Sequence, residues 1–152
     1  MTNQINQINH TNHINNTNHI NQTNHTNHIN KTAIITGASR GIGAAIAKKL
    51  ASCGYNLSLC CRNSSDRLKA LADELHCAYG IEVLCYTGNV GDFFFAKDMV
   101  ANTISHFGHI DVLINNAGIS HIGLLSDMTP EEWNNIVAIN LTGVFNFTKL
   151  VI

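Results

Sequence analysis

The segment Thr36-Gly37-Ala38-Ser39-Arg40-Gly41-Ile42-Gly43 has residue types and a spacing suited to binding a phosphate group. Its three glycines let the backbone turn tightly and come close to a ligand. A short β-rich run at residues 33–36 precedes the segment, and a helical pattern that begins near Ile42 follows it. The first amides and the positive end of a helix bind anions, so this order of elements predicts the pyrophosphate site of a dinucleotide. The alternative is that the glycines serve helix–strand packing alone.

Two arginines flank the place where the adenosine ribose of a dinucleotide would lie. The second predicted strand ends in Cys60-Cys61-Arg62-Asn63 with no acidic residue before Asp66, and Arg40 lies in the glycine-rich segment. A carboxylate at this strand end takes the ribose hydroxyls of NAD, whereas arginine favours the 2′-phosphate of NADP. The two guanidinium groups therefore predict NADP(H) over NAD(H), unless both are simply exposed to solvent.

Two further turns follow predicted strands and carry small or amide side chains. In Gly88-Asn89-Val90, the amide of Asn89 both donates and accepts, which matches an adenine edge, and Val90 offers the ring an apolar contact. In Asn115-Asn116-Ala117-Gly118, the small residues Ala117 and Gly118 and the amide of Asn116 allow the backbone to approach a cofactor closely. Each segment taken alone is also compatible with a simple turn.

Asn140 is the candidate for chemistry that lies on a predicted helix. It shares an apolar stripe with Trp133, Ile136, Val137 and Val144. We therefore expect its amide to be buried and to have hydrogen-bond partners. A structural and a catalytic role for Asn140 are equally compatible with this position.

The apolar pattern from residue 31 onward alternates between short runs and helical periods. Strands are predicted at residues 33–36, 57–61, 81–86 and 110–114, each followed by a turn and a helix. Four such units predict right-handed crossovers and a parallel sheet covered on both faces. The predicted fold class is α/β, a doubly wound sheet of the Rossmann type, in which ligands bind beyond the carboxyl ends of the strands.

The expected helix ends come from capping residues. Ser65 is the predicted cap of the second helix, and Gly80 and Gly108 are the predicted ends of the second and third. The last helix has the clearest start, with Thr129 as N-cap, Pro130 at the first position and Glu132 three residues after Thr129. The sequence stops inside this helix, so we expect a sheet truncated after its fourth strand.

Residues 1–30 differ from the rest of the chain. They contain no Asp, Glu, Lys or Arg, and Asn stands at every third position from Asn3 to Asn30. A period of three fits neither a helix nor a strand, so we expect a disordered repeat tail followed by a dinucleotide-binding domain at residues 31–152. The tail contains H-x-x-H spacings, but an unfolded segment predicts no specific metal site.

Composition excludes several classes of partner. The chain has 152 residues, with 9 Lys+Arg against 10 Asp+Glu and a formal net charge of -1, which predicts no nucleic-acid or anionic membrane partner. No apolar run approaches about 18 residues and no secretory signal is recognisable, so we expect a cytoplasmic protein. The 5 cysteines show no C-x-x-C spacing and predict small buried side chains in a reducing compartment.

Taken together, the motifs resemble those of the NADP-dependent short-chain dehydrogenase/reductase family. They are Thr36-Gly37-x-x-x-Gly41-x-Gly43, Asn115-Asn116-Ala117-Gly118 and Asn140-Leu141-Thr142-Gly143, and the resemblance covers residues 31–152. The nearest subgroup is similar to 3-oxoacyl-carrier-protein reductases. The resemblance implies hydride transfer between NADP(H) and a carbonyl or alcohol substrate, with a 3-oxoacyl thioester on an acyl carrier as one candidate. It also implies that the complete protein is a homo-oligomer.

The resemblance also implies a catalytic set that this chain holds only in part. The family uses a Tyr as general acid/base, a Lys beside it, a Ser on the carbonyl and an Asn that holds a water, and only the Asn has a counterpart, Asn140. No tyrosine is followed by Lys at the fourth position, because Leu59, Val83 and Val90 stand there. We therefore expect the 152-residue chain alone to be inactive. Three hypotheses stay open: the N-terminal part of a reductase, a non-catalytic dinucleotide-binding module, or an inert truncated product.

Overall fold

The protein contains one parallel β-sheet with helices on both faces. The computed structural model describes residues 30–152, and the repeat predicted as a tail lies outside them except for Asn30. The strands, in the order β3-β2-β1-β4 across the sheet, are β1 (Thr32–Thr36), β2 (Asn56–Cys61), β3 (Val83–Thr87) and β4 (Val112–Ile114). All pairings are parallel, which confirms the predicted α/β class and the crossover connections.

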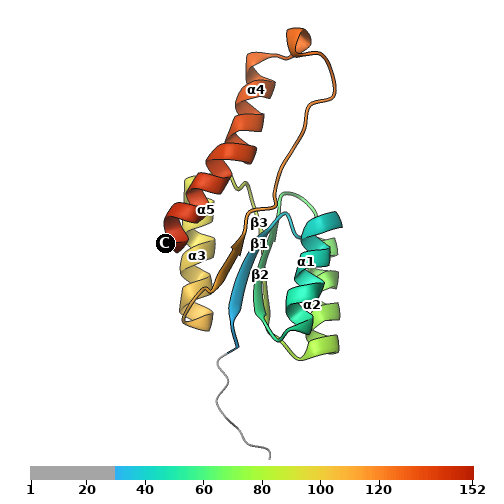
Figure 1. The fold of residues 1–152 in the computed structure, drawn as a ribbon, viewed down its shortest axis with the longest axis vertical. Coiled ribbons are helices and arrows are strands. Elements are labelled where there is room, and N and C mark those ends of the chain that lie inside the picture. The colour runs from blue at the N-terminus through green and yellow to red at the C-terminus, as the bar shows by residue number, and fades with distance from the viewer. Residues whose placement is uncertain (1–29) are drawn as a thin grey trace, which may run out of the picture.

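Two pairs of helices cover the two faces of the sheet (Figure 1). The helices are α1 (Gly41–Ser52), α2 (Ser65–Tyr79), α3 (Phe93–Phe107), α4 (Pro130–Val137) and α5 (Gly143–Val151). The first two lie on one face, and α3 and α5 lie on the other. After β4 the chain passes through a short 3-10 turn at Leu125–Asp127 into α4, which extends beyond the end of the sheet. The last two helices are joined by a π-helical segment at Ala138–Thr142.

Side chains of the central strand reach both apolar layers. Successive residues of a strand point to opposite faces, and here Ile35 packs in the layer under α1 and α2 while Ile34 packs in the layer under α3 and α5. Both side chains are fully buried. Burial on both faces explains why the first two strands are recognisable in the sequence as nearly continuous apolar runs.

Several helix ends follow the predicted signals. Gly80 and Gly108 end α2 and α3 in the left-handed conformation, with φ of 67° and 85°. The Thr129 hydroxyl accepts a hydrogen bond from the Glu132 N–H, and the Glu132 carboxylate accepts one from the Thr129 N–H. This second bond holds the pKa of Glu132 below its usual value. The predicted capping box is therefore confirmed.

Other local predictions are wrong by one or two residues. Ser64 rather than Ser65 is the N-cap of α2, and its side chain makes no capping hydrogen bond. The third strand begins at Val83 rather than at Ile81, although Ile81 is buried in the layer under α1 and α2. The fourth strand begins at Val112 rather than at Ile110, and the side chain of the preceding Asp111 accepts a hydrogen bond from the Thr32 N–H at 2.7 Å.

The sequence predicts one uninterrupted last helix, whereas the structure interrupts it with the π-helical segment. The wider turn of a π-helix rotates the residues that follow around the helix axis. One apolar stripe therefore does not stay on one face, and Trp133 is 54% exposed while Phe147 is 0% exposed. Asn140, on the same stripe, is also exposed, so the prediction of a buried Asn140 is wrong.

The fully buried residues of α1 are small, and the burial of the cysteines differs in part from the prediction. The first helix buries Gly43, Ala47 and Ala51, and Ile42 is exposed, because small residues let the helix backbone approach the sheet closely. Of the free cysteines, Cys60 and Cys61 on β2 are buried, whereas the others are exposed: Cys53, Cys77 and Cys85. Within residues 30–152, every helix is too short or too polar to cross a membrane.

The packing of the first strand predicts the effect of a small truncation. Replacing Ile35 with Val removes one methylene between the sheet and α1–α2, and we expect the free energy of unfolding to fall by about 0.5–1.5 kcal/mol. Denaturant titration measures the change. The control is Ile122→Val, whose side chain is 98% exposed and whose effect should stay below about 0.5 kcal/mol. Equal losses from the two variants would contradict the packing described here.

Candidate functional site

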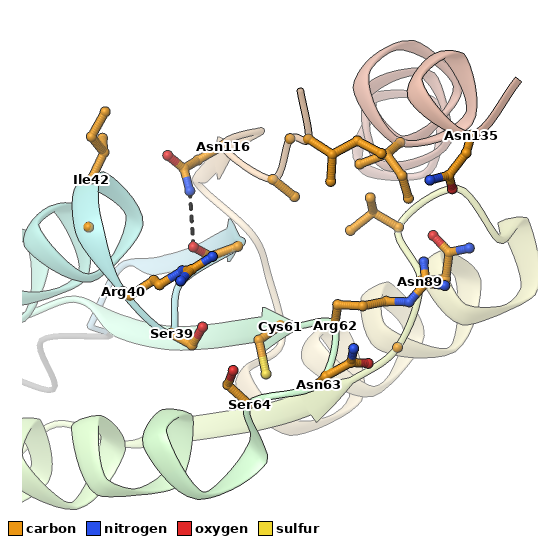
Figure 2. A pocket seen from close by; sticks show the side chains of 18 residues that line it. Ser39, Arg40, Ile42, Cys61, Arg62, Asn63, Ser64, Asn89, Asn116 and Asn135 are labelled. Atoms are coloured by element: carbon orange, nitrogen blue, oxygen red, sulfur yellow. Dashed lines mark hydrogen bonds between the residues drawn. The ribbon is translucent and has the colours of Figure 1, made fainter. Parts of the chain in front are cut away.

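A cleft of about 650 Å³ opens at the carboxyl ends of the strands (Figure 2). Its size is that of a typical small-molecule or cofactor site. The structure brings together in its lining all but one of the predicted cofactor-binding residues: Gly37, Ser39, Arg40, Gly41, Ile42, Arg62, Asn63, Asn89, Val90, Asn116, Ala117 and Gly118. The exception is Gly43. Four segments that are distant in sequence therefore share one cavity.

The hydroxyl of Thr36 joins the turns after β1 and β4. Its oxygen accepts hydrogen bonds from the N–H groups of Asn116 and Ala117, both at 3.0 Å, and its O–H lies 3.4 Å from the carbonyl oxygen of Ile114. The Asn116 side-chain amide donates back to the carbonyl oxygens of Thr36 at 3.0 Å and Gly37 at 3.1 Å. Figure 2 shows this amide above the glycine-rich turn. These hydrogen bonds join the turn after β1 and the turn after β4 into one surface, the floor of the cleft.

The glycines of the turn have different physical roles. Gly37 has φ of +67°, and a Cβ there would lie 2.8 Å from the Cα of Ala117. A Cβ on Gly43 would lie 2.5 Å from the carbonyl oxygen of Gly37, so Gly43 permits close packing of the turn behind the cleft. A Cβ on Gly41, at φ +58°, would meet nothing within 4 Å. The backbone at Gly41 is therefore the part of the turn open to a ligand.

The start of α1 is suited to an anion. Its N-cap, Arg40, makes no side-chain capping hydrogen bond, and its first turn contains no acidic residue. The first amides of a helix have no partner within the helix and form its positive end. Ser39, Gly41 and Ile42 at this helix start all line the cleft. The turn can therefore hold a phosphate group without displacing any side-chain cap.

Two cationic side chains line the same cleft. Among residues 30–152, no carboxylate forms an ion pair with Arg40 or Arg62. The lining contains no acidic residue, whereas Ser39, Asn63 and Ser64 add polar groups beside the two arginines. Figure 2 shows these side chains around the end of β2 and the start of α2. Both guanidinium groups are thus available to a phosphate.

The turn after β3 forms another wall of the cleft. The side-chain oxygen of Asn89 accepts a hydrogen bond from the Gly91 N–H at 3.0 Å. Its NH₂ group makes no hydrogen bond within residues 30–152 and is the free donor of this side chain. Val90, beside it, is 7% exposed and offers an apolar surface. The side-chain oxygen of Asn89 is thus already in use as an acceptor, and its NH₂ group is left to donate to a ligand.

Asn140, the predicted catalytic residue, lies outside the lining of this cleft. Its oxygen accepts from the Ile119 N–H at 2.9 Å, and its NH₂ donates to the Ile119 carbonyl at 2.8 Å. This pair of bonds ties the π-helical segment to the chain after β4. The amide is satisfied although it is exposed, and its catalytic role stays a prediction.

The cleft includes residues that the sequence analysis did not single out: Cys61, Ser64, Gly88, Ile119, Asn135 and Ile139. Cys61 and Gly88 lie inside the predicted segments without a predicted binding role, and Ser64 and Ile119 directly follow such segments. Asn135 and Ile139 lie on α4 and the π-helical segment. No local pattern marks these two, because tertiary packing alone brings them to the cleft.

Neither the Cys60 thiol nor a metal cluster of the described residues offers an alternative chemistry at this site. Burial raises the pKa of the Cys60 thiol to about 12, so this thiol stays protonated at neutral pH and is a poor nucleophile. Within residues 30–152, no group of three or more His, Cys, Asp or Glu side chains is placed to hold a metal ion. The histidines of the repeat at residues 1–29 lie outside the described part of the chain.

The family model for short chain dehydrogenases matches residues 31–152. The chain belongs to this family. The 3-oxoacyl-[acyl-carrier-protein] reductase FabG of Staphylococcus epidermidis is 43% identical over 121 residues, which cover 80% of this chain and 49% of that protein. The D-beta-hydroxybutyrate dehydrogenase of Cupriavidus necator is 38% identical over 122 residues, covering 80% of this chain and 46% of that protein. The chain thus spans about half the length of these short-chain dehydrogenases.

Solved short-chain dehydrogenase structures share the fold. An alcohol dehydrogenase from the archaeon Thermococcus sibiricus, complexed with 5-hydroxy-NADP, superposes with a TM-score of 0.76 at 38% identity. The match covers 80% of this chain and 51% of the chain of that structure. A short chain dehydrogenase from Burkholderia cenocepacia in complex with NADP has a TM-score of 0.77 at 31% identity, with 80% and 49% covered. These similarities support the assignment to the family from the fold as well as from the sequence.

The hydrogen bonds of Thr36 predict a difference between two threonines of β1. Thr36→Val leaves two part-buried backbone N–H groups without their acceptor, and we expect the free energy of unfolding to fall by about 2 kcal/mol. Thr32→Val is the matched control, because the buried Thr32 hydroxyl has no hydrogen-bond partner among the described residues. Denaturant titration should show no loss for Thr32→Val. Equal losses for both variants would contradict the role given to the Thr36 hydroxyl.

Proposed function

We propose that this chain binds NADP(H) in the cleft and forms the cofactor-binding part of an oxidoreductase that transfers hydride to or from a carbonyl or alcohol substrate. The observation that carries the proposal is the charge of the cleft. Arg40 and Arg62 line it beside the uncapped start of α1, and within residues 30–152 neither has a carboxylate partner. Membership of the short-chain dehydrogenase family supports the reaction class.

The residues present fit the parts of the cofactor. The open backbone at Gly41 and the start of α1 would hold the pyrophosphate, and Arg40 and Arg62 would hold the 2′-phosphate. The NH₂ of Asn89 would donate to the adenine edge while Val90 contacts the ring. The floor at 116–118 would lie beside the nicotinamide half. The bound cofactor supplies the hydride, and these residues bind and orient it.

NADP(H) is favoured over NAD(H) by the side chains at the end of β2. An acidic residue there would accept hydrogen bonds from the ribose hydroxyls and repel the 2′-phosphate. The cleft has Arg62 and Asn63 at this place and no acidic residue in its lining. Two of the similar structures hold NADP or a hydroxylated NADP, which supports the same choice.

We propose a 3-oxoacyl thioester or a related 3-hydroxyacyl compound as the substrate class. The support is the set of relatives, which includes the carrier-protein reductase, the D-beta-hydroxybutyrate dehydrogenase and an acetoacetyl-CoA reductase of Rhizobium meliloti at 39% identity over 118 residues. These names share an oxygen function at the third carbon of an acyl group. A homo-oligomeric complete protein and a cytoplasmic location are further parts of the proposal, and the free cysteines fit a reducing compartment.

In the proposed function, the 152-residue chain binds NADP(H) but does not by itself catalyse the reaction. This sequence contains no Tyr-x-x-x-Lys, the motif that supplies the general acid/base in the family, so the role proposed for Asn140 needs partners from further sequence. The alternative function, a non-catalytic dinucleotide-binding module, rests on the same observation. The oxidoreductase hypothesis and the binding-module hypothesis both require NADP(H) binding, whereas the hypothesis of an inert product does not.

We expect the purified 152-residue chain to bind NADPH without oxidising it when acetoacetyl-CoA is added. Fluorescence titration measures binding, and the absorbance of NADPH over time measures turnover. A FabG reductase is the positive control for the assay. Steady NADPH oxidation by this chain would contradict the requirement for the Tyr-x-x-x-Lys motif, and the absence of saturable binding by folded protein would contradict the proposed function itself.

The charge of the cleft predicts that replacing Arg62 affects NADPH binding more than NADH binding. Arg62→Glu should weaken NADPH binding by about ten- to a hundredfold, because it removes charge-assisted hydrogen bonds to the 2′-phosphate and adds repulsion. NADH binding should change little or improve. The control is Arg67→Glu on α2, which makes the same charge change at an exposed residue that does not line the cleft. Equal losses for NADPH and NADH, or equal effects of the two variants, would contradict the assignment.

A further inference from the structure

A buried amide on α5 contacts the turn that forms the adenine wall of the cleft. Asn146 is 2% exposed, and its NH₂ donates a hydrogen bond to the carbonyl oxygen of Val90 at 3.2 Å. The donor and the acceptor are 56 residues apart in sequence. A buried polar side chain needs such a partner, so this bond specifies how α5 meets the turn.

The bond from Asn146 leads directly to the side chain of Asn89. The Val90 carbonyl and the Gly91 N–H belong to the same planar peptide unit. Asn146 holds the carbonyl end of this unit, and the N–H end donates to the side-chain oxygen of Asn89 at 3.0 Å. Rotation of the peptide would break both bonds together. The orientation of the Asn89 amide therefore depends on Asn146.

Close backbone packing leaves this peptide little room to move. A Cβ on Gly143 of α5 would lie 2.9 Å from Cγ2 of Val90, and a Cβ on Gly91 would lie 2.7 Å from the carbonyl oxygen of Ala138. The turn is thus in contact with α5 and with the π-helical segment at the same time. Close packing of this kind opposes a shift of the peptide relative to the helix.

We infer that Asn146 is a positioning residue for the adenine end of the bound cofactor, acting through the Val90–Gly91 peptide on the Asn89 side chain. The inference rests on the proposed binding of NADP(H). Asn146 does not line the cleft and touches no cofactor. Its effect is to present the NH₂ of Asn89 and the surface of Val90 in a fixed arrangement, so that binding does not have to order them.

The first test replaces Asn146 with Leu. This change removes the hydrogen-bond donor and puts an apolar side chain of similar size in its place. We expect the dissociation constants of NADPH and NADH to rise by the same factor of about ten, because both carry adenine and the lost bond is buried. The ratio of the two constants should stay that of the unchanged protein. Hydrogen exchange at the Gly91 amide should become about ten times faster while exchange at Ile34 in β1 stays the same.

Two further variants separate positioning from general stability. Thr103→Val removes another buried side-chain hydrogen bond, between Thr103 of α3 and Ser58 of β2, and should lower the melting temperature without changing either dissociation constant. Gly143→Ala favours the helical backbone but adds a Cβ that displaces Val90. It should weaken both cofactors about tenfold with the helical circular dichroism retained, and it provides the test if Asn146→Leu does not fold.

The inference is overturned if folded Asn146→Leu or Gly143→Ala binds both cofactors within about twofold of the unchanged protein. It is also overturned if only NADPH is affected, since that would place the effect at the 2′-phosphate. Failure of the unchanged chain to bind either cofactor contradicts the proposed function. In that case hydrogen exchange at the Gly91 amide still tests whether Asn146 holds the Val90–Gly91 peptide, because this exchange is measured without a ligand.

Discussion

The hydroxyl of Thr36 is the group on which the geometry of the cleft depends, because it satisfies two backbone N–H groups of a turn 80 residues away. Asn116 returns two hydrogen bonds from its side chain to the carbonyls of Thr36 and Gly37. The donors and acceptors are part-buried, so breaking one bond leaves polar groups that water reaches poorly. The set therefore forms as a whole and holds the glycine-rich turn in the conformation that leaves Gly41 open. A floor fixed in this way would not have to be ordered when a ligand binds.

The charge of the cleft follows from what the fixed floor leaves unpaired. The start of α1 has no side-chain cap, Arg40 and Arg62 have no carboxylate partner in the described chain, and no acidic residue lines the cavity. Cationic groups held beside a helix N-terminus attract anions more strongly than either feature alone. In the proposed function, the same arrangement would distinguish a phosphorylated ribose from a free one. Cofactor choice and cofactor binding would then depend on one set of groups.

The helices after β4 connect the two halves of the cleft. The π-helical segment places Asn140 against Ile119 on one side and Ala138 against Gly91 on the other. Asn146 then continues the contact to the Val90 carbonyl. An uninterrupted α-helix would present these residues at different angles around its axis. The wider turn therefore matters for the cleft, since it lets one helical segment contact both the turn after β3 and the chain that follows β4.

The sequence by itself determined the fold class, the order of the elements and the segments that line the cleft, because apolar periodicity, glycine spacing and capping residues act over a few neighbouring residues. It also identified the two arginines, since their place after β1 and β2 follows from the strand order. Tertiary structure alone decided the exposure of Asn140, the packing role of Gly43 and the presence of Asn135 and Ile139 in the cleft. It also decided the links from Thr36 to Asn116 and from Asn146 to Val90. These depend on contacts between residues 56 to 81 positions apart, and no local pattern in the chain encodes which side chains meet across such distances.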